Sequence, residues 1–211
     1  TYGNGLFVTV GHSGTIDTSL DGNSWKRNGG PGHNAPTVTS YHLYGVTYGN
    51  GTFVTVGYSG TILTSTDGTI WTETTSGTDH RLLGVTYGNG LFVVVGYRTI
   101  LTSPDGNSWT KRNAGRRRDL KGVTYGNGLF VTVGKSGTIL TSSDGNSWTS
   151  RTNGTKNIIY GVTYGNGLFV TVGWLGTILT SSDGTTWTER TPEPIRRRHL
   201  RGVTYGNGLF V

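Results

Sequence analysis

The sequence predicts an all-β fold: a five-bladed β-propeller of four-stranded antiparallel blades, closed by pairing of the N- and C-terminal segments. Two repeated patterns and a regular alternation of strand-like runs with glycine turns lead to this prediction. The tetrapeptide YGNG begins at Tyr2, Tyr48, Tyr87, Tyr125, Tyr164 and Tyr205. The pattern S-x-D-G-x-x-W ends at Trp25, Trp71, Trp109, Trp148 and Trp187. A period of about 40 residues is typical of propellers and solenoids, in which each repeat buries its faces against its neighbours. We therefore expect one domain, 1–211, with five repeats and a partial sixth.

One repeat, 122–152, shows the elements expected of a blade. Strand-like runs occupy 122–125, 129–133, 138–142 and 148–152. Asn127-Gly128 suits a two-residue type I′ hairpin turn, because both central residues of that turn need a positive φ. The segments 134–137 and 143–147 are similarly short and contain glycine. Each repeat should therefore form an antiparallel meander, and its apolar middle strands indicate a sheet covered on both faces.

The S-x-D-G-x-x-W segments resemble the Asp-box repeat, also called the BNR or sialidase-type repeat, of many β-propellers. They read "SLDGNSW", "STDGTIW", "SPDGNSW", "SSDGNSW" and "SSDGTTW". The resemblance implies that each segment forms the hairpin between the third and fourth strands of a blade and is structural. The physical chemistry agrees, because an aspartate can accept hydrogen bonds from turn amides and a tryptophan can pack between blades. The expected structural aspartates are Asp21, Asp67, Asp105, Asp144 and Asp183.

Composition excludes several classes of protein. The 37 glycines offset the hydrophobic share of 32%, and the aromatic residues supply large areas for burial, so we expect a folded chain. No stretch approaches the roughly 18 apolar residues that a membrane span needs, and neither end resembles a signal peptide. The chain has no cysteine, so no disulfide pattern indicates a compartment. We expect a soluble protein and assign it no localisation.

The two ends of the chain have the same sequence, TYGNGLFV. Segment 202–205 repeats a first strand that the N-terminus largely lacks, so we expect it to complete the first blade. Segment 206–211 also repeats 3–8, which leaves one second strand too many for a ring of five blades. We expect one copy to lie unpaired or to pair with another molecule, which would give self-association.

The length variation identifies one end of each sheet as variable. The YGNG tyrosine and the following Asp-box tryptophan are 23 residues apart in four repeats and 22 in the third, whereas the next connection varies from 16 to 23. In an antiparallel meander the first and third hairpins share one end, and the second hairpin lies at the other with the crossover to the next repeat. The crossovers are 28–43, 74–82, 113–120, 152–159 and 191–200.

Two further sets of variable residues should lie at the crossover end, near the rim of the central channel. One set follows the Val-Gly of the second hairpin, and the other precedes the Gly-Val of the innermost strand. The candidate ligand-binding residues are His12, Tyr58, Tyr97, Lys135 and Trp174 from the first set and Tyr44, Lys121, Tyr160 and Arg201 from the second. Aromatic and cationic side chains on a uniform frame are typical of a binding surface. The alternatives are variation at solvent-exposed positions and aromatic side chains that cover the core.

Charge distinguishes the two ends of the predicted propeller. The net charge is +7, and the crossover end carries most of the basic residues while the Asp-box end carries five aspartates. A basic face consists of two triplets, Arg116, Arg117 and Arg118 with Arg196, Arg197 and Arg198. Such a face attracts anionic partners, although an exposed arginine run is often a solvated loop.

Catalytic patterns are missing from the sequence. We recognise no arginine triad, tyrosine nucleophile or acid of the sialidase type, and the three glutamates make no evident glycosidase pair. The histidines lack metal-ligand spacing, although His42 and His199 fall at equivalent crossover positions. We therefore expect no enzyme activity, no catalytic residue, no metal and no cofactor.

The sequence predicts a non-catalytic recognition module, lectin-like or protein-binding, with its ligand at the crossover end. The ligand is a glycan or a protein, and an anionic ligand fits the charge; a specific nucleic acid and a membrane span are not expected. The alternative is a designed or recently amplified repeat scaffold with no evolved ligand, because the repeats are nearly identical.

Overall fold

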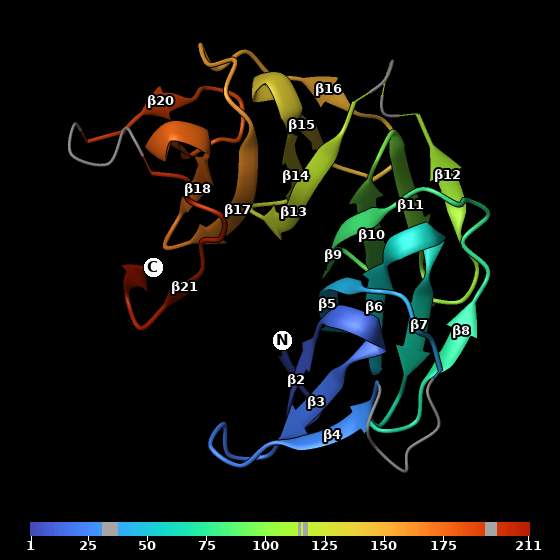
Figure 1. The fold of residues 1–211 in the computed structure, drawn as a ribbon. Coiled ribbons are helices and arrows are strands. Elements are labelled where there is room, and N and C mark those ends of the chain that lie inside the picture. The colour runs from blue at the N-terminus through green and yellow to red at the C-terminus, as the bar shows by residue number, and fades with distance from the viewer. Residues whose placement is uncertain (31–37, 114, 116–117, 193–197) are drawn as a thin grey trace. The chain divides into compact units, whose positions relative to one another are not determined.

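The computed structural model describes residues 1–30, 38–113, 115, 118–192 and 198–211 of the chain. The chain forms two compact units, one made of Thr1–Gly96 and Leu101–Lys111 and the other of Tyr97–Ile100 and Arg112–Val211. In the described residues all long elements are strands, joined by tight turns and single turns of 3-10 helix (Figure 1).

Five four-stranded antiparallel sheets follow one another along the chain, and the strands of each are hydrogen-bonded in sequence order. The first contains β1 (Tyr2–Gly3), β2 (Leu6–Val10), β3 (Ile16–Ser19) and β4 (Lys26–Gly29). The second contains β5 (Leu43–Gly49), β6 (Thr52–Gly57), β7 (Ile62–Ser65) and β8 (Thr72–Thr74), and the third contains β9 (Leu82–Gly88), β10 (Leu91–Gly96), β11 (Thr99–Ser103) and β12 (Thr110–Arg112). The fourth contains β13 (Leu120–Gly126), β14 (Leu129–Gly134), β15 (Ile139–Ser142) and β16 (Thr149–Ser150), and the fifth contains β17 (Ile159–Gly165), β18 (Leu168–Gly173), β19 (Ile178–Ser181) and β20 (Thr188–Glu189).

The Asn-Gly turns have the predicted geometry. In the fourth repeat Gly126 pairs with Leu129, so Asn127 and Gly128 alone form the loop. Their φ angles are 47° and 75°, and the other five YGNG copies have both central residues at positive φ as well. The prediction of two-residue type I′ turns is confirmed for every repeat.

The second hairpin differs from a simple glycine turn in four of the five sheets. Short 3-10 turns connect the second and third strands: η1 (His12–Gly14), η2 (Tyr58–Gly60), η3 (Lys135–Gly137) and η4 (Trp174–Gly176). The middle residue of each has a left-handed backbone, as at Ser13, with φ 53°. The third sheet is one residue shorter here, and Arg98, with φ 52°, takes the left-handed position.

The innermost strands begin earlier than the sequence indicated, because each carries a β-bulge. Strand β13 starts at Leu120, which pairs with Gly134, whereas Gly122 pairs with Val133. Lys121 is therefore the extra residue, and the same shift occurs in β5, β9 and β17. A bulge bends the strand and re-aims the extra side chain, so these residues leave the regular alternation of the sheet.

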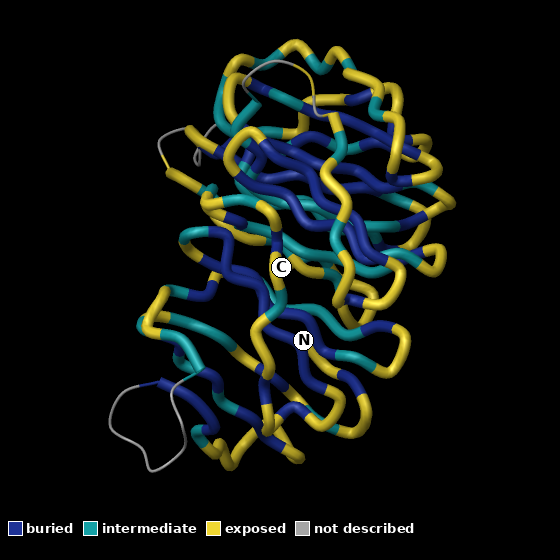
Figure 2. The backbone as a smooth tube through the Cα atoms, turned by 90° about the vertical axis from the view of Figure 1, so that its right-hand side faces the viewer, coloured by how far each residue is buried: buried dark blue, intermediate teal, exposed yellow. Residues whose placement is uncertain are grey.

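Within each unit the sheets pack face to face through apolar side chains. In the first unit Phe53, Leu63 and Trp71 of the second sheet pack with Val8 and Ile16 of the first. In the second unit Phe169, Leu179 and Trp187 of the fifth sheet pack with side chains of β14 and β15. The buried stretches lie along the strands, and the exposed residues lie mainly at turns and loops (Figure 2). The expectation of sheets with two covered faces is confirmed for the second sheet, which contributes to the cores on both of its sides.

The terminal segments pair differently from the expectation. Tyr2 pairs with Phe7, and Tyr205 of β21 (Tyr205–Gly206) pairs with Phe210 of β22 (Leu209–Phe210), so each YGNG copy forms its own hairpin. Both second strands, β2 and β22, are therefore paired within their own hairpins, and the expectation of an unpaired copy is wrong. The physical reason is that a two-residue Asn-Gly turn closes locally.

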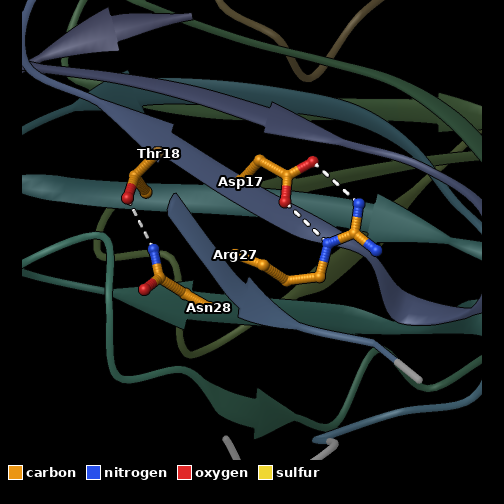
Figure 3. Close-up of polar contacts among 4 residues, drawn as sticks. All are labelled: Asp17, Thr18, Arg27 and Asn28. Atoms are coloured by element: carbon orange, nitrogen blue, oxygen red, sulfur yellow. Dashed lines mark hydrogen bonds and ion pairs between the residues drawn. The ribbon is translucent and has the colours of Figure 1, made fainter. Parts of the chain in front are cut away.

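Asp17 stands where the other sheets have a buried leucine. Its carboxylate accepts hydrogen bonds from Nε of Arg27, at 2.8 Å, and from Nη2 of Arg27, at 3.3 Å (Figure 3). On the neighbouring strand positions the amide of Asn28 donates to the hydroxyl of Thr18. Phe7, in the same sheet, is 37% exposed, whereas its equivalents in the other four-stranded sheets are fully buried. The carboxylate is tolerated because it is paired and lies on a partly exposed sheet.

Candidate functional site

The S-x-D-G-x-x-W turns, called Asp-box turns here after the repeat that they resemble, lie at the end of each sheet opposite to the crossovers, and their aspartate and indole groups are hydrogen-bonded. Asp67 accepts hydrogen bonds through Oδ1 from the backbone N–H groups of Thr69 and Ile70 and from the hydroxyl of Ser65. The indole of Trp71 donates to the carbonyl of Gly68, at 3.0 Å. The same bonds to an aspartate and from an indole recur in the other four turns.

These bonds change the acidity of the carboxylates. The backbone amides of Ile70 and Thr69 lower the pKa of Asp67 from 3.8 to about 2. The amides of Ser147 and Asn146 lower the pKa of Asp144 to about 2 in the same way. A carboxylate that accepts several amide bonds is stabilised in its charged form. The geometry gives these aspartates a structural part in the turns.

The crossover end places the first set of candidate residues at the start of the 3-10 turns. His12, Tyr58, Lys135 and Trp174 are the first residues of η1 to η4, and Tyr97 precedes the left-handed Arg98 in the third sheet. Tyr58 is 38% exposed and Trp174 39%. The turn holds each residue through its backbone, because the carbonyl of residue one accepts the N–H of residue four, as Thr61 donates to Tyr58. These side chains therefore project from anchored turns.

The second set of candidate residues occupies the bulges. Tyr44, Lys121 and Tyr160 are the extra residues of β5, β13 and β17, and Arg201 lies at the equivalent place before Gly202. The following glycines bring neighbouring innermost strands close together: a Cβ on Gly122 would lie 3.1 Å from the carbonyl oxygen of Tyr160. Lys121 and Tyr160 therefore stand on adjacent strands at the same end of the second unit.

In the first unit the candidate residues form two groups of rings. His12 packs against His42 with 4.3 Å between the ring centroids and the planes tilted by 54°, and Tyr44 approaches His42 edge-on at 6.5 Å. Tyr41 and Tyr58 are 5.7 Å apart, and the guanidinium carbon of Arg81 lies 4.9 Å from the Tyr58 ring centroid. The backbone N–H of Tyr58 donates to the carbonyl of His42, which links the two groups.

In the second unit cations again accompany the aromatic rings. The ammonium of Lys121 lies 4.9 Å from the ring centroid of Tyr97, and the guanidinium carbon of Arg201 lies 5.2 Å from that of Tyr160. Lys135 faces the carboxylate of Asp119 at 3.8 Å.

Trp174 packs against a histidine ring. Its ring centroid lies 4.5 Å from that of His199, and the two planes are tilted by 45°. The structure thus brings the predicted residues together in small groups within each unit.

The basic triplets are described in part. Arg118 donates through Nη1 to the hydroxyl of Ser150, at 3.2 Å, and Arg198 is exposed. Arg116, Arg117, Arg196 and Arg197 lie outside the described residues.

Sequence reasoning missed several residues of the site. Tyr41 and Asp119 belong to the groups above but were not among the candidates, and the importance of His42 and His199 was left open. Most of them share a position: His42, Arg81 and Asp119 each precede the buried leucine that begins an innermost strand, and His199 precedes Leu200 at the equivalent place in the repeat. The equivalence of His42 and His199 was visible in the sequence, but the contacts that these residues make were not.

A polar hollow of about 500 Å³ lies beside η2 at the crossover end of the second sheet. It is lined by hydroxyl groups and one carboxylate, from Ser59, Glu73, Thr74, Thr75, Ser76 and Thr78 together with Gly60 and Gly77. The hydroxyl of Thr74 is buried without a hydrogen-bond partner.

The described residues lack the features of two other kinds of site. They contain no group of three or more histidines, aspartates and glutamates placed to hold a metal ion. No helix in this described part of the chain has the length and apolar character needed to cross a bilayer.

No protein-family model matches the chain, and no curated protein matches it. Solved structures do match its fold. Virginiamycin B lyase from Staphylococcus aureus is 18% identical, with a TM-score of 0.81 over 99% of this chain and 73% of that protein. The computationally designed Ika8 protein is 12% identical, with a TM-score of 0.74, and the chain covers 65% of its length.

A third match is YCF48 from Cyanidioschyzon merolae, 18% identical, with a TM-score of 0.61 over 81% of this chain and 62% of that protein. A structure of YCF48 bound to D1 peptide also matches, at 14% identity, with a TM-score of 0.54 over 95% of this chain and 82% of that one. Identities this low show the fold alone. With five repeated four-stranded sheets, they confirm the β-propeller class predicted from the sequence.

Proposed function

We propose that this chain is a non-catalytic recognition module that binds an acidic, extended segment of another protein at the crossover end of its sheets. The observation that carries the proposal is the repeated pairing of a tyrosine with a cation at that end. The pairs are Tyr58 with Arg81, Tyr97 with Lys121 and Tyr160 with Arg201. They occur in both units, on anchored turns and bulges.

These pairs have the chemistry of a protein-binding surface. Tyrosine and arginine are enriched among the residues that dominate binding energy, because a rigid ring offers apolar area and a polar hydroxyl. The cations supply charge-assisted hydrogen bonds to carboxylates, and the net charge of +7 accelerates encounter with an acidic partner. An acidic segment with some apolar residues fits both the tyrosine rings and the cations of this surface.

A structure of similar fold supports a peptide as the ligand class. YCF48, whose fold this chain shares, has been solved bound to D1 peptide. The likeness carries the fold and not the partner. It is compatible with recognition of a peptide on this architecture.

The carboxylates of the described residues support a module without catalysis. The five Asp-box aspartates are bonded in turns, Asp17 is paired with Arg27, and Asp119 faces Lys135. Glu73 and Glu189 pair across outer strands with Leu63 and Leu179, and not with another carboxylate.

Selection from a displayed library of random peptides, at near-physiological salt, tests the proposal. We expect enrichment of sequences rich in aspartate and glutamate with interspersed apolar residues. Calorimetry with the selected peptides should then show at least tenfold weaker binding to Tyr58→Ala, about 1.4 kcal/mol. Ile70→Ser is the control, because Ile70 is an exposed apolar residue at the Asp-box end of the same sheet. Equal loss in both variants, or selection without acidic enrichment, would count against the proposal.

A glycan is the second candidate ligand, and the hydroxyl-lined hollow beside η2 is the observation that favours it. Hydroxyl and carboxylate groups can bond sugar hydroxyls, and the exposed Trp174 offers a ring on which a sugar can stack. A glycan array at low and near-physiological salt separates the candidates. Salt-resistant binding that is lost in Trp174→Ala would favour a lectin. An absence of binding in both screens would favour a scaffold without an evolved ligand. The similarity in fold to a designed protein is compatible with that interpretation.

A further inference from the structure

We propose that His42 and His199 are positioning residues of the crossover end, each of which fixes a 3-10 turn in its neutral form and releases that turn when it is protonated. The turns are η1 and η4, which carry the candidate ligand residues His12 and Trp174. The consequence for binding rests on the proposed function, whereas the effect on the turns does not.

The first arrangement joins the first crossover to η1. The backbone N–H of Ser13 donates to Nδ1 of His42, with 3.0 Å between the two nitrogens. The His42 ring also stacks on the ring of His12, the first residue of the turn. The backbone N–H of Leu43, the next residue, donates to the carbonyl of Gly11, at 2.9 Å. His42 is thus held beside η1 by the contacts of its own ring and by the backbone bond of the next residue.

The second arrangement repeats the first in the other unit. The backbone N–H of Leu175 donates to Nδ1 of His199, at 3.3 Å, and the His199 ring stacks on Trp174. The N–H of Leu200 donates to the carbonyl of Gly173, at 3.0 Å. The two copies share the acceptor atom, the stacked ring and the neighbouring backbone bond. Two unrelated contacts would not share all three.

The hydrogen bond determines the protonation state of the ring. An imidazole accepts at Nδ1 only when it is neutral with its proton on Nε2, because both nitrogens of a protonated histidine are donors. Protonation would set the new Nδ1–H against the N–H of Ser13 or Leu175. A histidine side chain ordinarily changes its charge between about pH 5 and 8. Acid should therefore remove one anchor from each turn.

The anchored residues lie in the left-handed region, as do Ser59 and Ser136 in the turns η2 and η3. Ser13 and Leu175 have φ angles of 53° and 54°, in the left-handed region that non-glycine residues rarely adopt. Loss of the histidine bond therefore removes one contact that favours this sparsely populated backbone geometry. The turn would then move the side chain that precedes the strained residue, which is His12 or Trp174.

Neighbouring charged groups do not hold the protonated rings in place. His42 faces His12, Tyr44 and the backbone of Tyr58, and His199 faces Trp174 and lies between Arg198 and Arg201 in the chain. Among the described residues no carboxylate lies within ion-pair distance of either ring. His80 differs, because its Nδ1 lies 3.4 Å from the carboxylate of Asp79.

The corresponding turn of the third sheet lacks a titratable acceptor. The N–H of Arg98, which holds the left-handed position there, donates to the backbone carbonyl of Arg118, at 3.0 Å. In the fourth sheet the turn is η3, and the crossover residue equivalent to His42 is Ile158, which has no titratable side chain. These turns therefore serve as references inside the same molecule.

An NMR titration of the whole chain from pH 8 to pH 5 tests the inference without a ligand. We expect the amide resonances of Ser13 and Leu175 to move in step with the ring protons of His42 and His199, while the amide of Arg98 stays unchanged. In His199→Asn the Leu175 amide should no longer titrate, because the asparagine Oδ1 replaces Nδ1 as an acceptor that carries no charge change, and the residue before Leu175 is Trp174. His80→Asn is the matched control and should leave both titrations as in the wild type.

A flat Ser13 amide in the wild type, while the His42 ring titrates, would overturn the inference. Continued titration of the Leu175 amide in His199→Asn would also overturn it. The test is independent of the proposed function, because it follows the turns directly. If the amides titrate and no ligand is found in the screens, the positioning role stands and the proposed function fails.

Discussion

Each Asp-box carboxylate lies near the surface and yet accepts several hydrogen bonds. The pKa of Asp67 falls from 3.8 to about 2 because the amides of Ile70 and Thr69 stabilise the charged form. The stabilising contribution is complete above pH 3.8, where the unfolded chain is also ionised, and is lost as the pH falls towards about 2. We expect Asp67→Asn to lower the melting temperature at pH 7 by a few degrees and to approach the wild type near pH 2. Thermal unfolding followed by circular dichroism between pH 7 and pH 2 measures this.

Asp79→Asn is the control for that titration. Its carboxylate is 91% exposed, and its one ion pair in the described residues is to His80. We expect no comparable change in melting temperature. A loss in Asp67→Asn that is the same at pH 7 and pH 2 would contradict the role given to the turn amides.

The ion pair between Asp17 and Arg27 permits a second prediction for single residues. Partly exposed ion pairs contribute about 0–1 kcal/mol. Asp17→Leu restores the residue type of the other sheets but loses this pair, so we expect the free energy of unfolding to change by less than about 1 kcal/mol. Arg27→Ala removes only the partner and should be slightly destabilising. Chemical denaturation measures both variants, and a gain of several kcal/mol in Asp17→Leu would show that the carboxylate is costly.

Packing between neighbouring innermost strands depends on the first glycine of the YGNG tetrapeptide. A Cβ on Gly126 would lie 2.1 Å from Cγ of Tyr164, the tyrosine of the next repeat. Gly206 has the same place in the last repeat, and a Cβ there would meet nothing within 4 Å. We expect Gly126→Ala to destabilise the chain by about 1–3 kcal/mol, as overpacking does, and Gly206→Ala to have little effect. Denaturant unfolding of the two variants makes the comparison, and similar values for both would contradict this packing.

Sequence reasoning predicted the elements well where local chemistry decides them. The Asn-Gly turns and the four strands of each repeat follow from residues a few positions apart. The bulges were not predicted, because the residue before Gly122 looks like an ordinary strand position until its pairing with β14 is known. The 3-10 turns were expected only as short glycine turns, since the left-handed residue is Ser136 in one repeat and Leu175 in another.

Several residues of the candidate site were predicted individually, but the contacts between their side chains were not. Tyr58 and Lys121 were identified from their variability at fixed repeat positions. Their partners, Arg81 and Tyr97, come from other strands or crossovers, and a sequence period gives no distances between side chains. The hydrogen bonds to His42 and His199 depend on the same tertiary contacts.

At the scale of the whole molecule, the last hairpin bears on self-association. Leu209 is 65% exposed and Val211 82%, although β22 pairs with β21 inside its own repeat. Self-association through 206–211 stays a prediction of the sequence. Sedimentation velocity over a hundredfold range of concentration tests it: a concentration-dependent dimer that is lost in Leu209→Ser would support it, and a monomer throughout would reject it.

The central claim is that the crossover end, with its paired tyrosines and cations, is the binding surface. The most direct measurement is calorimetry of the best selected acidic peptide with wild type, Lys121→Ala and Lys111→Ala. The two variants lose the same charge, but Lys121 is the bulge residue stacked on Tyr97, and Lys111 is an exposed residue of β12. We predict at least tenfold weaker binding in Lys121→Ala and unchanged binding in Lys111→Ala. Equal effects of the two substitutions, or none in Lys121→Ala, would contradict the claim.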